Sequence, residues 1–102
     1  MEHEAFLTFL GLVRRAGKLQ CGEEQTIQAR KRGKACMILL ASDASANAVD
    51  RAESVSHEGS CPLLRVPCTK AQLAEATGAA PFAMAAVCDR GFAETLKKKL
   101  AG

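Results

Sequence analysis

Residues 35–41 read Ala-Cys-Met-Ile-Leu-Leu-Ala, and this stretch decides the fold. Seven apolar residues in a row are typical of a strand that is buried on both faces. The run follows Gly33 and precedes Ser42 and Asp43, residue types that are common in turns. The sequence therefore predicts a central strand here, in a sheet covered by helices on both sides.

Helices and further strands are expected to alternate around this strand. Helical spacing and helix-terminating glycines predict helices over about 4–16, 23–32 and 46–58, and Thr69 and Asp89 are expected to cap two more. Shorter extended segments are expected at 18–21, 62–67 and 82–88. The alternation predicts one α/β domain over residues 1–102, a three-layer α-β-α sandwich around a mostly parallel sheet.

The basic residues are concentrated in two stretches. The formal net charge is only +3, but residues 14–34 and 97–99 hold ten of the 14 Lys and Arg and two of the 11 acids, a local charge of +8 against −5 elsewhere. Such an asymmetry indicates a polyanionic partner. Trp and Tyr are absent, which excludes base stacking on aromatic side chains as the main way of binding. Lys97 to Lys99 are interpreted as a solubilising helix end.

Cysteine usage and the N-terminal residues indicate the compartment. The five cysteines are odd in number and irregular in spacing, so a complete disulfide framework is excluded and a reducing compartment is expected. Arg14 and Arg15 follow the first apolar stretch, the reverse of a secretory signal, and no apolar run approaches the roughly 20 residues of a membrane span. We expect a cytoplasmic protein.

No pattern of catalytic residues is evident. The chain lacks a phosphate-binding loop, a dinucleotide fingerprint and a nucleophile elbow. His57, Cys61 and Cys68 have an unusual spacing for zinc and no evident fourth ligand, so the cysteines are interpreted as packed apolar residues. Ser42 and Asp43 suit a ligand site at a strand end but are interpreted as a turn. We expect neither enzymatic activity nor a cofactor.

Residues 18–34 carry the one functional signal. Gly22 stands directly before the predicted helix, whose N-terminal N–H groups suit a phosphate. Amide and charged side chains share one helix face or flank it: Glu24, Gln28 and Lys31, with Gln25 and Arg32 beside them. Amides can pair with base edges and cations with phosphates. The same residues also suit an ordinary solvated helix, and the sequence alone leaves both interpretations open.

Three stretches resemble a known bacterial family. They are LGLVRRAGKL at 10–19 followed by Gly22-Glu23-Glu24, LASDAS at 40–45, and DRGFA at 89–93. Over about residues 6–98 the chain resembles YlxQ-type proteins of the kink-turn-binding ribosomal-protein superfamily, the L-seven-Ae and L-thirty-e kind. The resemblance implies an α-β-α sandwich with a small mixed sheet, and RNA binding without catalysis. Kink-turns are duplexes bent sharply at a short bulge beside sheared G·A pairs.

The resemblance also implies two contact regions. Kink-turn binders of this superfamily read the G·A pairs with a Gly-Xaa-Asn-Glu-Xaa-Xaa-Lys segment, which corresponds here to Gly22, Glu24, Gln25 and Gln28. Glu24 replaces an asparagine and Gln28 a lysine, so affinity or specificity is expected to differ. The second region, an apolar loop after the fourth helix, corresponds to residues 79–83 and would pack against the extruded nucleotide. The same loop also suits the simple start of the last strand.

These observations together predict a small, monomeric, non-catalytic ribonucleoprotein component without metal or cofactor. Its expected partner is kink-turn-like structured RNA such as ribosomal RNA. The expected RNA contacts are Lys18, Gly22, Glu23, Glu24, Gln25, Gln28, Lys31, Arg32, Lys34, Ala80, Pro81 and Phe82. One alternative is a protein-interaction adaptor of the transcription or ribosome machinery that has lost kink-turn specificity. Another is the RNA-recognition half of a modification enzyme.

Overall fold

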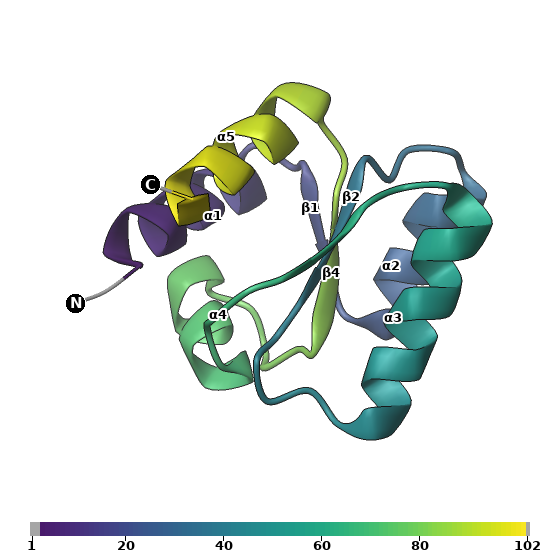
Figure 1. Cartoon of the computed structure of the whole chain (residues 1–102). Helices are drawn as coiled ribbons and strands as arrows, with labels where there is room; N and C mark the ends of the chain where they lie inside the picture. The colour runs from purple at the N-terminus through teal and green to yellow at the C-terminus, as the bar shows by residue number, and fades with distance from the viewer. Residues whose placement is uncertain (1–2, 102) are drawn as a thin grey trace.

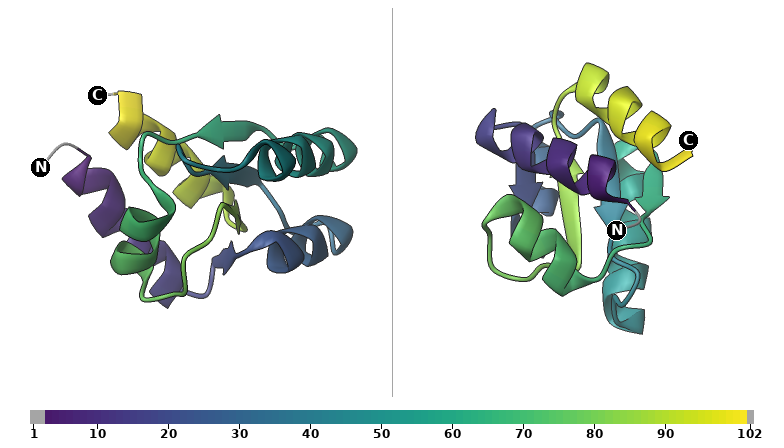
Figure 2. Two further views of the ribbon diagram at one scale, coloured as in Figure 1. Left: turned by 90° about the horizontal axis from the view of Figure 1, so that it is seen from below. Right: turned by 90° about the vertical axis from the view of Figure 1, so that its left-hand side faces the viewer.

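Helices and strands alternate along the whole of the computed structural model, which describes residues 3–101 (Figure 1). The elements are α1 (Glu4–Arg15), β1 (Leu19–Cys21), α2 (Glu23–Lys31), β2 (Met37–Leu40), α3 (Ala46–Gly59), β3 (Leu63–Arg65), α4 (Lys70–Thr77), β4 (Met84–Val87) and α5 (Arg90–Ala101). Every expected helix and strand is present, and the strands are shorter than the apolar segments that predicted them. The three-layer α-β-α architecture is confirmed, with α2 and α3 on one face of the sheet and α1, α4 and α5 on the other (Figure 2).

The sheet is mixed, and the expectation that it is mostly parallel is wrong. Its strand order is β1-β4-β2-β3. Only β2 and β3 are parallel, joined by the crossover helix α3, whereas β4 runs antiparallel to both β1 and β2. The last strand therefore inserts between the first two with the opposite direction. Alternation of helices and strands does not fix strand direction, so the sequence pattern did not reveal this.

The central strand is buried on both faces, as its apolar run predicts. Met37 and Leu39 pack with Phe6 of α1 on one side of the sheet, and Ile38 and Leu40 pack with α3 on the other. All four strand residues are at most 1% exposed. Each face of the sheet thus has its own hydrophobic core, and the helices of both layers are held by side chains of one strand.

Capping residues start the helices where the sequence predicts. The Ser45 hydroxyl accepts a hydrogen bond from the Ala48 N–H at the start of α3, and Asp89 Oδ1 accepts one from the Phe92 N–H at 2.9 Å at the start of α5. Thr69 begins α4 with a capping box. None of the helices in the described part of the chain is long and apolar enough to span a membrane.

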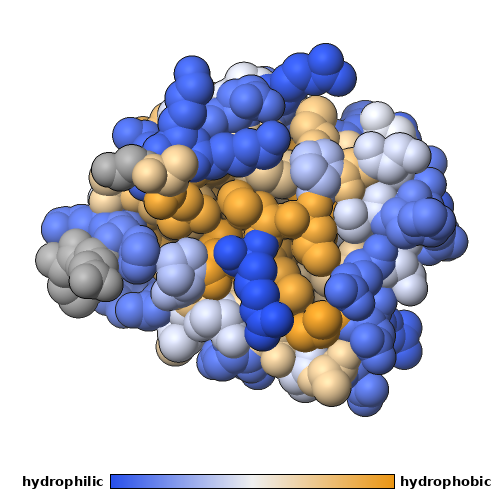
Figure 3. All heavy atoms as spheres, viewed as in Figure 1, coloured by the Kyte–Doolittle hydropathy of each residue, from blue (hydrophilic) through white to orange (hydrophobic). Residues whose placement is uncertain are grey.

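The edge strand β3 brings apolar side chains to the surface between the two helical layers. Leu63 and Leu64 are half-buried there, and Figure 3 shows an apolar area on this face. Pro62 and Pro67 flank the strand and the exposed Arg65 lies at its end. Proline and charge at an edge oppose pairing with a strand of another molecule.

Helices α1 and α4 approach each other closely at Gly11. A Cβ atom built at Gly11 would lie 2.7 Å from the Ala76 carbonyl oxygen, closer than real Cβ contacts. Because the obstructing atom belongs to the backbone, it cannot move without shifting α4. Glycine at this position therefore sets the distance between the two helices.

We expect Gly11→Ala to lower the free energy of unfolding by about 1–2 kcal/mol, because the overpacking cost exceeds the roughly 1 kcal/mol that alanine gains in helix propensity. Urea unfolding followed by circular dichroism measures the difference. Thr8→Ala, at an exposed position of the same helix, is the control and should stay within about 0.5 kcal/mol of the wild type. A Gly11→Ala protein as stable as the wild type would contradict the close packing.

Candidate nucleic-acid interface

Gly22 joins β1 directly to α2 and fixes the start of the predicted contact helix. Its φ of +106° is a conformation that favours glycine. The Gly22 N–H donates to the Met84 carbonyl oxygen at 2.9 Å, and the Gly22 carbonyl accepts from the N–H and the hydroxyl of the fully buried Thr26. The helix start is therefore anchored to the sheet. No side chain of the described residues caps it, so its first N–H groups stay available to a ligand.

The C-terminal end of α2 is closed by a Schellman motif. Gly33 has φ +70°, its N–H bonds the Arg30 carbonyl at 3.0 Å, and the Lys34 N–H bonds the Ala29 carbonyl at 2.9 Å. This turn reverses the chain just after Arg32. Lys34, which follows this turn, lines the same depression as Lys18.

Two depressions meet along the start of α2. The first, which we call the basic arm, has a volume of about 570 Å³ and is lined by Gly17, Lys18, Gln20, Gln25, Gln28, Ala29, Arg32, Gly33, Lys34 and Cys88. The second, the loop arm, has about 740 Å³ and is lined by Arg14, Gly17, Leu19, Gln20, Cys21, Gly22, Gln25, Gly78, Ala79, Ala80, Pro81 and Phe82. The two share Gly17, Gln20 and Gln25, so they form one groove, here named the α2 groove.

The α2 groove brings together nine of the twelve residues that the sequence predicts as RNA contacts. They are Lys18, Gln25, Gln28, Arg32 and Lys34 in the basic arm, and Gly22, Ala80, Pro81 and Phe82 in the loop arm. The helix start and the loop before β4, about 60 residues apart in the chain, thus line one surface. Phe82 is only 5% exposed and belongs to the core, so Ala80 and Pro81 form the exposed part of the loop.

Three predicted residues lie outside the groove lining. The Glu23 carboxylate is 3.1 Å from the Arg51 guanidinium of α3, so its side chain turns toward the neighbouring helix. Glu24 and Lys31 are exposed on α2 and line neither arm. Neither acid at the start of α2 therefore lines the groove, and the Glu23 carboxylate is paired with Arg51.

The groove lining is cationic and rich in amides. Among the described residues, its charged members are Arg14, Lys18, Arg32 and Lys34, and no carboxylate lines either arm. Gln20, Gln25 and Gln28 add side chains that both donate and accept hydrogen bonds. Cations for phosphates and amides for base edges are the two kinds of contact that nucleic-acid recognition needs.

Arg14 and Gln20 line the groove but are missing from the sequence prediction. Gln20 follows the buried Leu19 in β1, so strand alternation alone places it on the exposed side. Arg14 lies in the last turn of α1, where a basic side chain also complements the negative end of the helix, so its position alone does not indicate a contact. Its Nη1 donates to the Cys21 sulfur at 3.2 Å, a contact that only the turn between α1 and β1 creates. Burial raises the pKa of the Cys21 thiol, and the Arg14 guanidinium partly offsets that rise.

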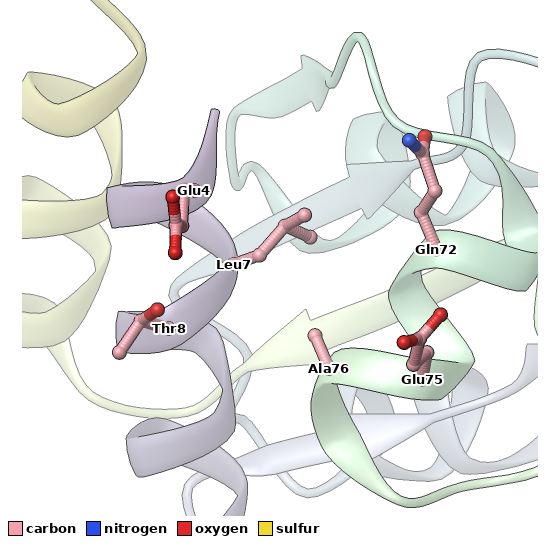
Figure 4. Close-up of a pocket in the computed structure, with 6 residues that line it drawn as sticks. All are labelled: Glu4, Leu7, Thr8, Gln72, Glu75 and Ala76. Atoms are coloured by element: carbon pink, nitrogen blue, oxygen red, sulfur yellow. The ribbon is translucent and has the colours of Figure 1, made fainter. Parts of the chain in front are cut away.

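A depression between α1 and α4 offers the opposite chemistry (Figure 4). It has a volume of about 340 Å³ and is lined by Glu4, Leu7, Thr8, Gln72, Glu75 and Ala76. Within residues 3–101, two carboxylates and no cation line it, which disfavours a polyanion. Of the two surfaces, the α2 groove is the one that suits nucleic acid.

The C-terminal lysines lie on the other side of the sheet from α2. The Lys97 ammonium is 3.5 Å from the Glu94 carboxylate, and the Lys99 ammonium lies 5.5 Å from the centre of the Phe9 ring. These contacts are local to α5 and α1, so the lysines do not extend the α2 groove. They agree with the interpretation of this segment as a solvated helix end.

The described residues contain no group of three His, Cys, Asp or Glu that is suited to a metal ion. Cys61 and Cys68 belong to the cores on opposite faces of the sheet, while His57 is exposed. These three side chains therefore do not converge, and the interpretation of both cysteines as packed residues is confirmed.

The sequence that builds this fold matches a known family. The sequence model of the Ribosomal protein L7Ae/L30e/S12e/Gadd45 family matches residues 4–97. The chain belongs to this family. The resemblance to YlxQ-type proteins is also confirmed: the chain is 32% identical over 100 residues to the RNA-binding protein YlxQ of Enterococcus faecium, covering 94% of this chain and 91% of that protein. It is 32% identical over 87 residues to RNA-binding protein YlxQ of Bacillus subtilis, covering 85% and 86%.

Solved structures share the family fold. A Bacillus halodurans protein of unknown function superposes with a TM-score of 0.85 at 28% identity, over 95% of this chain and 97% of that one. The Giardia lamblia 15.5kD RNA binding protein superposes with a TM-score of 0.74 at 16% identity, over 93% and 81%. The second likeness concerns the fold alone.

Asp43 has a structural role at the end of the central strand. Its Oδ1 accepts the N–H of Lys70 at 2.9 Å, a group in the first turn of α4 that has no partner within the helix. The turn interpretation of Ser42 and Asp43 thus has a physical basis, because this carboxylate ties the loop after β2 to the next helix.

We expect Asp43→Ala to lower the free energy of unfolding by about 1 kcal/mol, the usual cost of losing a helix cap, because the Lys70 N–H loses its acceptor. Asp43→Asn keeps an acceptor and should cost about half as much. Chemical denaturation of the three proteins measures both values. Equal stability of wild type and Asp43→Ala would reject the structural role and reopen the interpretation of Asp43 as a ligand residue.

Proposed function

We propose that this chain binds structured RNA in the α2 groove and reads a kink-turn-like bend without catalysis. The observation that carries the proposal is the groove lining, where four cations, three glutamines and the 79–82 loop meet and no carboxylate intrudes. Membership of the family and similarity to proteins named RNA-binding support it. The RNA would be ribosomal RNA or another structured RNA.

Each part of the groove would take a different part of the RNA. Gly22 lacks a side chain, so the sugar–phosphate backbone can approach the free N–H groups at the start of α2. Gln25 and Gln28 would pair with base edges. Ala80 and Pro81 would cover an unstacked nucleotide, with the buried Phe82 supporting them from the core.

The cations of the basic arm would hold the phosphates. Lys18 lies just before β1, whereas Arg32 and Lys34 both follow α2. All three line the same depression, so an RNA strand that follows it meets all three. Lys31, which is exposed at the end of α2, would contact RNA that extends beyond the groove. These contacts fix the orientation of the RNA and leave the reading of sequence to the amides.

The same geometry predicts how recognition differs from that of relatives with lysine at the position of Gln28. A glutamine donates a hydrogen bond without charge assistance, and such bonds are weaker. Glu24 is exposed and does not line the groove, so solvent and salt would screen the repulsion between its carboxylate and the RNA phosphates. We expect the reading of G·A pairs to survive with lower affinity.

A titration against a kink-turn RNA tests the proposed reading. The control is the same RNA with Watson–Crick pairs in place of its G·A pairs, which removes the bend but keeps the charge. We expect at least tenfold tighter binding to the kink-turn, measured by fluorescence anisotropy at fixed salt. Equal affinity for both RNAs would reject kink-turn reading, and no binding to either would favour the protein-interaction adaptor.

The salt dependence of binding tests the basic arm. With about four phosphate contacts, log K should fall with log salt with a slope of about −3 to −4, and Lys34→Ala should make that slope shallower by about one. Lys98→Ala removes the same charge from an exposed position on α5, in the opposite helical layer, and should leave the slope unchanged. Identical slopes for the two variants would remove Lys34 from the interface.

A further inference from the structure

We infer that Arg14, on the last turn of α1, binds an RNA phosphate in the loop arm of the α2 groove. This inference rests on the proposed function and adds to it a contact from a helix that the kink-turn motif does not include. Three observations support it: where the guanidinium is held, how many of its donors are free, and which charges surround it.

The guanidinium of Arg14 is held beside the start of α2. Arg14 is half-buried, and its Nη1 donates to the sulfur of Cys21, the residue immediately before Gly22. Gly22 in turn is bonded to Met84 of β4. The side chain therefore occupies a defined place next to the glycine where the RNA backbone would approach closest. A cation that is already ordered loses less conformational entropy when it binds.

Most donors of this guanidinium remain free. A guanidinium carries five N–H donors, and the Cys21 thiol takes one of them. Among residues 3–101 Arg14 has no other hydrogen bond and no carboxylate within ion-pair distance, whereas Arg30 and Arg51 each have one. Four of its five N–H donors are therefore available to a phosphate.

In the part of the chain that the structure describes, Arg14 is also the one charged side chain in the lining of the loop arm. The lysines and Arg32 line the basic arm instead. An RNA strand that leaves the basic arm and passes between Gly22 and the 79–82 loop would meet no other cation in the lining of the loop arm. The planar fork of arginine binds two oxygens of one phosphate, so Arg14 can fix the strand at the point where the bulged nucleotide leaves the stack.

Arg15 provides a matched comparison. It is the next residue of the same helix turn and is equally placed to complement the negative end of α1, but it is exposed and does not line the groove. A general electrostatic role would make the two arginines equivalent. A phosphate contact in the loop arm would make Arg14 alone important for RNA.

The test compares kink-turn RNA binding of the wild type with that of Arg14→Ala, Arg14→Gln and Arg15→Ala, each with its thermal unfolding curve. We expect at least tenfold weaker binding for Arg14→Ala, the size typical of one charge-assisted hydrogen-bonded contact. Arg15→Ala should stay within about twofold of the wild type. Arg14→Gln keeps a long polar side chain that fills much of the same space but has no charge. We expect it to bind the RNA more weakly than the wild type does, with a salt slope shallower by about one.

Each outcome separates the inference from the proposed function. A wild type that does not bind the kink-turn contradicts the proposed function itself. A wild type that binds, with Arg14→Ala no weaker than Arg15→Ala, overturns the role of Arg14 and leaves the groove intact. If Arg14→Ala unfolds, Arg14→Gln decides, and wild-type affinity and slope in that variant would reject the phosphate contact.

Discussion

The hydrogen bond from the Gly22 N–H to the Met84 carbonyl oxygen joins the two segments on which the candidate site depends. Gly22 begins the contact helix, and Met84 begins β4 directly after the loop of residues 79–83. Because Met84 is buried, this bond also connects both segments to the core. A loop and a helix start from distant parts of the chain therefore keep a fixed separation, as a rigid recognition surface requires.

The insertion of β4 between β1 and β2 makes that bond possible. If the sheet were mostly parallel with β4 at an edge, the end of β1 and the start of β4 would not be neighbours. Alanines at positions 85 and 86 fill the middle of the sheet with little volume, which lets helices of both layers pack close to it. The fold detail that the sequence pattern predicted wrongly is thus the one that assembles the groove.

Most of the fold could be predicted from local patterns, and local patterns together with the family resemblance placed nine of the twelve expected contact residues in the groove. Apolar runs gave the strands, and Ser45, Thr69 and Asp89 gave the helix starts, because these signals act within a few residues. Strand direction, the turn of Glu23 toward Arg51 and the contact between Arg14 and Cys21 depend on which segments meet in space. The spacing of residues in the sequence does not indicate which distant segments come into contact, so these features are seen only in the structure.

The ends of the described chain lie at the same side of the molecule, where α1 begins and α5 finishes (Figure 1). Glu4 near one end and Lys99 near the other line a common surface. Arg14 lies at the opposite end of α1, about 15 Å along the helix axis from Glu4 at 1.5 Å per residue. A fluorophore, an affinity handle or a second protein module attached through either terminus would therefore project away from the groove and leave it open to a large RNA.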